Sequence, residues 1–466
     1  MPQSSWLRSR LMFGFLLSSA LNSIRRTPIL SLLAAATVAV GIGVSIPMMT
    51  VFHHMNANPV PDRGDRLFRV SLDNWNAERP FREPNDPPSV LTLQDVKNLA
   101  SATQPVARAG MFAAEAVIKP EGQGARPFKL AARVTESGFF EMFDPPFLAG
   151  SGWDARADAN QESVVVIGAG LSQKLFGTTD SVGRQVTVSG RPLTVVGVLA
   201  PWELTPVFYD MQNPFAEVEE IFVPMSLMFQ LNLVPTFWRS PLVLPSALSY
   251  ANFEQLFTTT EIVFAQYWVE LPDRASADAY RTWLDEYVVA QKALGRFPRP
   301  INNRLDDVGA WLDYTMKDSR DAGGVAALIV VTLLFYAVCL FNTVNLLLTK
   351  FVRGQSRVSL MRALGAAQSD IFVQYLIEVC LIAIVGGLAG VAIGLVGLDI
   401  SRSMFEHSSA LAVGSVNSGD GSGFWQMDLP MAVTAVLLAL VGGAAAGIYP
   451  ALKACRVSPA IGLKTQ

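Results

Sequence analysis

Cysteine is scarce in this 466-residue chain, and charged residues are fewer than in a soluble protein. No cysteine falls between Met55 and Asp321, so this long stretch cannot hold a disulfide; the three in the chain are Cys339, Cys380 and Cys455. Charged residues make up 16% of the chain and hydrophobic residues 51%, against about 25% charged residues in a typical soluble domain. This balance predicts an integral membrane protein.

The motifs of common enzyme sites are also missing. The sequence contains no GxxxxGK[ST], HExxH, CxxC pair or GxSxG. Gly168-Ala169-Gly170 resembles the start of a dinucleotide fingerprint, but Gln173 stands where a third glycine is needed, which favours a tight turn between a strand and a helix. Adjacent His53 and His54 would point about 100° apart on a helix, a poor arrangement for one metal ion. We therefore predict no catalytic, cofactor or metal site and expect the chain not to be an enzyme.

Long apolar runs are what the sequence does have. Four are long enough to cross a bilayer, which takes about 20 residues: 29–52, 322–349, 371–398 and 429–449. The first run is too long for the apolar core of a cleaved signal sequence, so we interpret it as a retained anchor. Residues 1–28 precede it, with apolar residues at helical spacing that fit either an amphipathic helix on the membrane surface or an extension of the first span: Trp6, Phe13, Leu17, Leu21 and Ile24.

Basic residues are placed unevenly around these runs. Four arginines precede the first run, four basic residues lie in 350–370 with one acid, and three basic residues occur in 450–466. Loop 399–428 carries only Arg402 as a basic residue. Because positive charge accumulates on the cytoplasmic side, both termini and segment 350–370 are predicted in the cytoplasm. The rest of the chain is net acidic, which argues against nucleic acid as a partner.

The polar stretch 53–321 has the pattern of an α+β domain. Leu67–Leu72, Phe128–Val134, Val164–Ile167 and Ile262–Leu271 read as strands, and Ser276–Leu294 as an amphipathic helix. Residues 185–199 read as a hairpin that turns at Ser189-Gly190. We expect two subdomains, about 66–200 and 260–312, separated by an insertion at 201–260. This insertion is rich in proline and aromatic residues and could be core, a loop resting on the membrane, or an exposed patch for a partner or substrate. The predicted fold class is thus a four-span α-helical membrane protein with a large α+β periplasmic domain between spans 1 and 2.

Two parts of the sequence resemble a known family. Asn342–Ala366, NTVNLLLTKFVRGQSRVSLMRALGA, is similar to the conserved core of the FtsX/MacB permease family. The outer stretch resembles the MacB-type periplasmic domain in Val134–Phe140, in VVVIGAGLSQKLFG, in Val182-Gly183-Arg184 and in Thr194–Val198. The family pattern covers most of the chain outside 201–260.

This resemblance implies a permease subunit of an ABC transporter in the bacterial inner membrane. A separate cytoplasmic ATPase dimer, which holds ATP and magnesium, would drive movements of the periplasmic domain (mechanotransmission) for export or extraction of a substrate. The chain itself would bind no cofactor. Implied partners are the lipid bilayer, a second permease in a homo- or heterodimer, a periplasmic adaptor and an outer-membrane channel. The alternative is an FtsX-like regulatory permease that controls an envelope enzyme such as a peptidoglycan hydrolase, although the size of 53–321 favours the exporter.

The resemblance also assigns a site. Segment 350–370 would couple to the ATPase through Arg353, Arg357, Val358, Leu360, Met361, Arg362, Leu364 and Gly365. Arg353 and Arg357 stand where the family usually has acids, which raises the hypothesis of a heterodimer with a more typical permease. Glu378, in the third run, is expected to snorkel or to pack between helices. Small residues spaced four apart predict close helix packing, within the chain or in a dimer: Gly386, Gly390, Gly394, Gly443 and Gly447.

Overall fold

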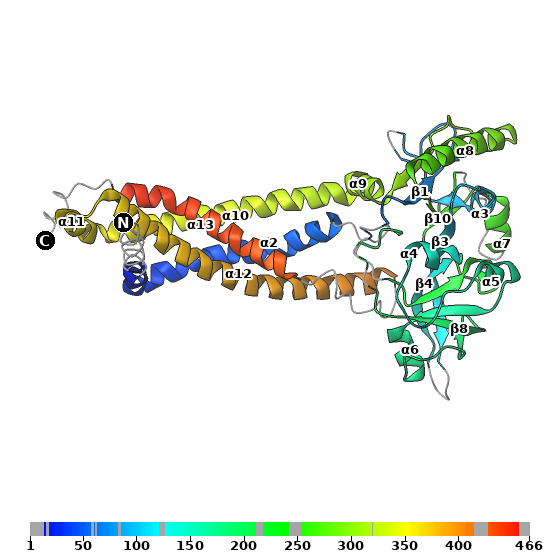
Figure 1. Cartoon of the computed structure of the whole chain (residues 1–466), viewed down its shortest axis with the longest axis horizontal. Coiled ribbons are helices and arrows are strands. Elements are labelled where there is room, and N and C mark those ends of the chain that lie inside the picture. The colour runs from blue at the N-terminus through cyan, green and yellow to red at the C-terminus, as the bar shows by residue number, and fades with distance from the viewer. Residues whose placement is uncertain are drawn as a thin grey trace, which may run out of the picture. The chain divides into compact units, whose positions relative to one another are not determined.

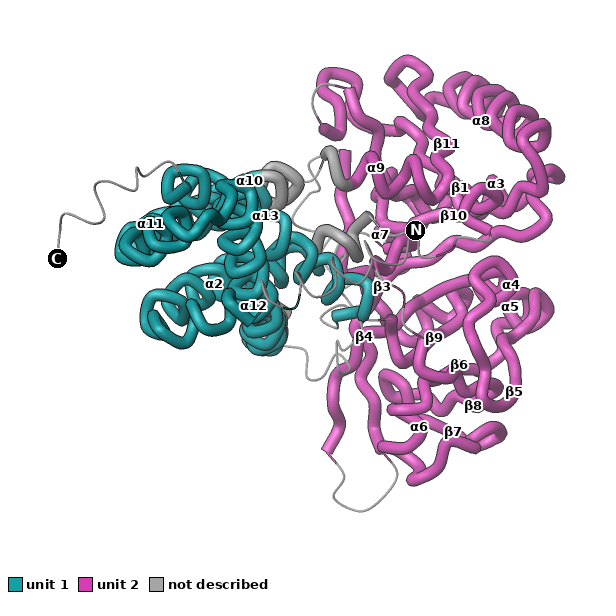
Figure 2. Tube along the Cα trace, turned by 60° about the vertical axis from the view of Figure 1, so that its left-hand side comes forward, with its two compact units in different colours: residues 1–53, 320–406, 425–466 teal, residues 54–319, 407–424 magenta. Residues whose placement is uncertain are grey.

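The computed structural model divides into two compact units, one helical and one built around a sheet (Figures 1 and 2). The residues it describes are 14, 18–56, 60, 63–82, 85–120, 126–202, 204, 206–210, 218–241, 253–318, 320–413 and 427–455. The helical unit comprises residues 1–53, 320–406 and 425–466, and the sheet unit comprises 54–319 and 407–424. Most of the predicted leader, including Trp6, Phe13 and Leu17, lies outside the described residues, and 18–26 are helical.

Four helices among the described residues are long and apolar enough to cross a membrane, which confirms the four predicted spans. They are α2 (Pro28–Asn56), α10 (Arg320–Arg353), α12 (Gln368–Val413) and α13 (Leu429–Cys455). Large apolar side chains are exposed on each of them, including Ile29, Leu333, Val385 and Val441. Lipid chains can cover such side chains, and the backbone polar groups of a helix are already hydrogen-bonded within the helix, so both features suit a membrane span.

Helix α12 is longer than the apolar run that predicts it. Its helical backbone continues to Val413, whereas the sequence predicted a loop from 399. Asp399, Arg402 and Glu406 end the hydrophobic run, but no proline or glycine stands between Leu398 and Val413 to end the helix. Polarity therefore marks where the apolar run stops and not where the helix stops.

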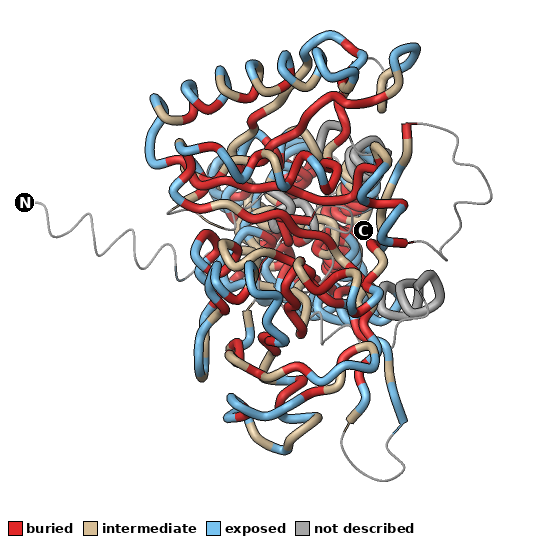
Figure 3. Tube along the Cα trace, turned by 90° about the vertical axis from the view of Figure 1, so that its right-hand side faces the viewer, coloured by how far each residue is buried: buried red, intermediate tan, exposed pale blue. Residues whose placement is uncertain are grey.

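The described residues of the sheet unit form eleven strands in one sheet, with the path β11-β1-β10-β3-β4-β9-β6-β8-β5, while β2 pairs with β10 and β7 pairs with β3 and β8. The strands are β1 (Leu67–Ser71), β2 (Leu91–Thr92), β3 (Ala107–Lys119), β4 (Phe128–Thr135), β5 (Phe147–Gly150), β6 (Val164–Gly168), β7 (Gln185–Val188), β8 (Arg191–Leu199), β9 (Ile221–Pro224), β10 (Val263–Glu270) and β11 (Arg304–Asp307). Its helices are α3 (Leu93–Leu99), α4 (Gly138–Phe143), α5 (Ala155–Asn160), α6 (Ala169–Phe176), η1 (Met225–Leu227), α7 (Phe253–Thr259), α8 (Arg274–Ala293) and α9 (Val308–Asp318). Buried residues run along most of the strands (Figure 3).

The predicted local elements are largely confirmed. Strands β1, β4, β6 and β10 lie where the sequence predicted strands, and α8 covers the predicted amphipathic helix with Asp273 as its N-cap. The β7–β8 hairpin turns at Ser189 and Gly190, whose φ values of 46° and 88° fit a type I′ turn. The glycine pair at 168 and 170 lies at the β6–α6 turn.

The predicted division into two subdomains along the sequence is wrong. Strand β10 comes from the second cluster, yet it lies between β1 and β3 of the first. Strand pairing over long sequence distances thus merges both clusters into one sheet, an arrangement that local patterns do not encode.

The described part of 201–260 belongs to the core of this unit. Strand β9 pairs parallel to β4 and antiparallel to β6, and Val207, Phe208 and Tyr209 are buried. Of the three possibilities for this insertion, the structure supports the core for the described residues.

Candidate functional site

The predicted coupling segment folds as a short helix, α11 (Gln355–Ala363), directly after α10. Gly354 separates the two helices, and Gly365 ends α11 with a φ of 98°. The amide of Gly365 donates to the carbonyl of Arg362, and that of Ala366 donates to the carbonyl of Met361. This pair of bonds is the Schellman motif, in which glycine supplies the left-handed residue.

Helix α11 sorts the predicted coupling residues into two faces. Leu360 is 56% exposed and Leu364 is 81% exposed. Val358 is only 4% exposed and packs with Phe351 and Tyr375 in the core of the helical unit, so any part it has in coupling would be played through this packing. The remaining predicted residues are exposed or half-buried: Arg353, Arg357, Met361, Arg362 and Gly365.

A basic hollow of about 270 Å³ lies between α11 and residues 23–27. Arg26, Arg353 and Arg357 line it, and none of them has a carboxylate partner among the described residues. Arg357 Nη2 donates to Ser19 Oγ at 3.2 Å. Three guanidinium groups without a neutralising carboxylate therefore line the hollow beside α11.

Lys350 is not the exposed loop charge that the sequence indicated. It lies within α10, is buried, and forms an ion pair with Glu378 of α12. Its Nζ also donates to Ser31 Oγ of α2 at 2.5 Å. Glu378 is likewise buried, so it does not snorkel; instead one ion pair and one hydrogen bond join three helices.

All five predicted packing glycines are buried where helices of this chain approach each other. A Cβ on Gly386, Gly390 or Gly394 of α12 would lie within 3.0 Å of atoms of α2. A Cβ on Gly443 or Gly447 of α13 would lie within 3.0 Å of Ala383 or Val379 of α12. The close approaches are within the chain, which favours packing over dimerisation for this stripe.

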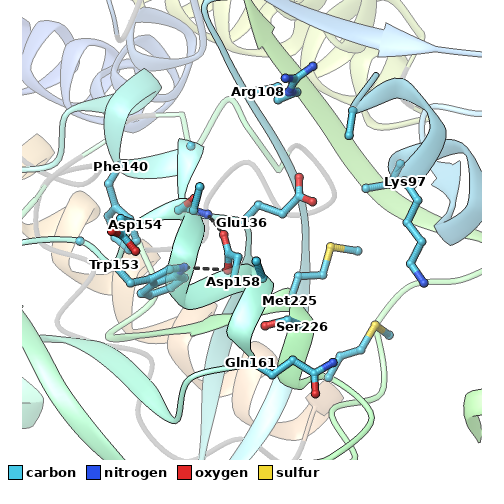
Figure 4. A pocket seen from close by; sticks show the side chains of 18 of the residues that line it. Lys97, Arg108, Glu136, Phe140, Trp153, Asp154, Asp158, Gln161, Met225 and Ser226 are labelled. Carbon is cyan, nitrogen blue, oxygen red and sulfur yellow. Dashed lines mark hydrogen bonds between the residues drawn. The ribbon is translucent and has the colours of Figure 1, made fainter. Parts of the chain in front are cut away.

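A second candidate site is a cleft of about 940 Å³ in the sheet unit (Figure 4). Helices α3, α4, α5 and α7, the start of β3 and η1 form its walls. Glu136 follows β4 and accepts a hydrogen bond from the amide of Gly110 at 2.7 Å. Asp158 accepts from Trp153 Nε1 at 2.9 Å and from the amide of Ser137 at 2.6 Å.

Burial sets the charge state of this cleft. It raises the pKa of Glu136 to about 7, the Asp158 carboxylate pushes in the same direction, and the Gly110 amide and Arg108 oppose it. Burial also raises the pKa of Asp158. The sequence analysis did not predict a site at these residues. It included Glu136 only in Val134–Phe140, the stretch that resembles the MacB-type periplasmic domain. An acidic residue directly after a buried strand was the available signal.

Comparison with known proteins adds the family context. The model of the MacB-like periplasmic core domain matches residues 31–287, and that of the FtsX-like permease C-terminal matches 329–459. The chain is 22% identical over 452 residues to the macrolide export ATP-binding/permease protein MacB of Azoarcus sp., covering 96% of this chain and 59% of that protein. It is 26% identical over 388 residues to the pyoverdine export ATP-binding/permease protein PvdT of Pseudomonas aeruginosa, covering 82% and 49%. The chain thus spans roughly half the length of these curated relatives.

Among solved structures, the chain is similar to the periplasmic region of MacB from Actinobacillus actinomycetemcomitans, with a TM-score of 0.35, 12% identity, and coverage of 56% of this chain and 96% of that one. It is also similar to the extracellular domain of the ABC-type transporter YknZ, with a TM-score of 0.29, 14% identity, and coverage of 46% and 87%. These scores are too low to add to what the family models show.

Proposed function

Because the chain belongs to the MacB-like, FtsX-like family of ABC transporter permeases, we propose that it couples ATP hydrolysis by a separate cytoplasmic ATPase to movements of its periplasmic domain. The chain would sit in the bacterial inner membrane with both termini and α11 in the cytoplasm. Movements of the periplasmic domain would drive export or extraction of a substrate across the envelope. In this proposal ATP and magnesium are held by the ATPase dimer.

Helix α11 is the observation that carries this proposal. Exposed Leu360 and Leu364 give it an apolar outer face, while buried Val358 anchors its inner face to α10 and α12. An apolar face on a short helix is a surface that a partner groove can bury. Because α11 is joined to α10 through Gly354 alone, a push on its outer face would pass directly to the long helix.

Charge supports a second permease in the assembly. Arg353 and Arg357 occupy positions where the family usually has acids. An ATPase with basic groups that pair with those acids would face two positive charges here and be repelled. We propose a heterodimer with a more typical permease that carries most of the electrostatic contact. A fully active complex with two copies of this chain and no other permease would rule out the heterodimer.

The coupling role is tested by Leu360→Asp in the complex purified from its host through a tag on this chain. Burying a leucine contributes about 1.5–3 kcal/mol, so its loss, together with a charge placed in the contact, should lower ATPase activity in nanodiscs roughly tenfold or more. Arg357→Glu should have a mild effect, since exposed charge contacts contribute about 0–1 kcal/mol.

A matched control is Leu294→Asp, which changes a leucine that is 76% exposed at the end of α8 in the sheet unit. We expect this variant to keep the activity of the unmodified complex. Equal activities for Leu360→Asp and Leu294→Asp, with the same subunits recovered, would contradict the proposed coupling surface.

A further inference from the structure

We propose that the cleft of the sheet unit binds a small organic cation with an apolar body. The proposal concerns a ligand site in this unit alone and does not depend on whether α11 contacts an ATPase. It combines the size of the cleft, the side chains in its walls, and a carboxylate whose second oxygen has no partner.

The size and lining suit a small molecule. A volume of about 940 Å³ lies at the upper end of the range of roughly 300–1,000 Å³ that is usual for ligand pockets. Apolar and aromatic side chains form much of the wall, including Val96, Phe140, Trp153, Met225 and Phe229. Methionine and aromatic surfaces adapt to flat or irregular apolar ligands.

The charged groups in the wall favour a cation. Five carboxylates line the cleft, from Glu136, Glu141, Asp154, Asp158 and Glu254, against two cations, Lys97 and Arg108. The Arg108 guanidinium already donates to the carbonyl of Ala102 at 2.7 Å, and Lys97 is exposed. An anion in this cleft would face an excess of like charge, whereas a cation would be attracted.

Glu136 is the group best placed to contact the cation. Only its Oε2 has a partner among the described residues, the Gly110 amide, so Oε1 is free to accept from a ligand. Its carboxylate points into the space between Arg108 and Met225 (Figure 4). Ser226 also lines the cleft, but its hydroxyl oxygen is closed off from solvent, so Glu136 is the polar group on which the proposal depends.

Ionisation of Glu136 links binding to pH. Its raised pKa of about 7 reflects burial and the nearby Asp158, while the Gly110 amide and Arg108 have the opposite effect; burial and, in turn, the Glu136 charge raise the pKa of Tyr267. A bound cation stabilises the ionised form, so affinity should rise as pH increases through 7. For a pKa of about 7, the affinity should fall about tenfold between pH 8 and pH 6.

Ethidium and 8-anilinonaphthalene-1-sulfonate are suitable probes, because they are aromatic molecules of similar size and opposite fixed charge. We would measure their binding to the full chain in phosphatidylcholine nanodiscs, with empty nanodiscs subtracted. Ethidium should bind saturably and the sulfonate should not. Glu136→Gln should weaken ethidium binding about tenfold at pH 8 and remove most of its pH dependence, because the amide carries no charge.

Two further variants distinguish a loss of binding in the cleft from a general effect of substitution on the protein. Ala100→Trp adds bulk at the exposed C-cap residue of α3, which lines the cleft, so it should block ethidium while Glu136 is retained. Glu115→Gln removes a carboxylate paired with Lys129 outside the cleft, and it should leave binding unchanged. The proposal fails if ethidium does not bind, if the sulfonate binds equally well, or if Ala100→Trp and Glu136→Gln both bind ethidium like the unmodified chain.

Discussion

Buried charges in both units are held by partners from distant parts of the sequence. Arg133 on β4 is 1% exposed; its Nη1 lies 2.9 Å from Asp210 Oδ2, and it also pairs with Glu219. Both carboxylates come from the insertion at 201–260, whose described residues therefore supply charge partners as well as apolar core. In the helical unit, Lys350 and Glu378 form the corresponding buried pair. Removing one partner from such a pair leaves a desolvated charge, which costs more than the pair contributes.

We therefore predict that Lys350→Met and Glu378→Met each destabilise the chain, by about 3–5 kcal/mol. In detergent this should lower the thermal midpoint by roughly 10 °C. The double variant should recover at least half of that loss, because neither charge is then left unpaired. Arg353→Met alters the exposed arginine at the end of α10, three residues after Lys350; it serves as the control and should change the midpoint little. Additive losses in the double variant would show that the ion pair does not couple the two positions.

At the scale of elements, the sequence predicts those with strong local patterns. The four apolar helices, the β7–β8 hairpin and α8 follow from hydropathy, from Ser189-Gly190 and from amphipathic spacing. Strand β3 was not predicted, although it is the longest strand among the described residues and pairs with β10, β4 and β7. Its sequence ARAGMFAAEAVIK is rich in alanine, which is disfavoured in strands, so only its buried position in the sheet decides its conformation.

The site was predictable to a similar degree. The resemblance placed the coupling segment, but it could not show that Val358 turns inward while Leu360 turns outward. The Lys350–Glu378 pair and the Glu136 cleft depend on contacts between residues far apart in the chain or on burial, and neither is encoded in a short motif.

Close packing of α12 against α2 gives a prediction at the same scale. A Cβ on Gly390 would lie 2.9 Å from Ile42 Cβ and 3.0 Å from the carbonyl oxygen of Ala39. Gly390→Leu should therefore force the helices apart and cost about 1–3 kcal/mol or more through overpacking. Ala392→Leu adds the same side chain at an exposed position of the same helix and should leave the thermal midpoint in detergent almost unchanged. Equal midpoints for the two variants would contradict this packing role.

Across the whole helical unit, the contacts define the relative directions of the four long helices. Thr37 of α2 meets Thr343 of α10 and Gly41 approaches Cys339, so these two helices run antiparallel. The contacts between α2 and α12 run from Ala35 with Gly386 to Ile46 with Gly394. Residue numbers increase in the same direction along both helices, so this pair runs parallel. The contacts of Gly443 with Ala383 and of Gly447 with Val379 make α13 antiparallel to α12. The start of α2, helix α11 and the end of α13 are thus at the same end of the bundle.

This arrangement sharpens the predicted topology, in which the basic residues at that shared end lie in the cytoplasm. Single cysteines at Ala100, Gln368 and Ala460, on a background lacking Cys339, Cys380 and Cys455, would test it with a membrane-impermeant thiol reagent. We expect Ala100→Cys to react in intact spheroplasts, and Gln368→Cys and Ala460→Cys to react only after the membrane is opened. Because the helix directions place 368 and the end of α13 together, these two positions must give the same result. Labelling of Ala100→Cys only from the cytoplasmic side, or of Ala460→Cys from outside, would overturn the orientation; opposite results at 368 and 460 would instead contradict the helix directions.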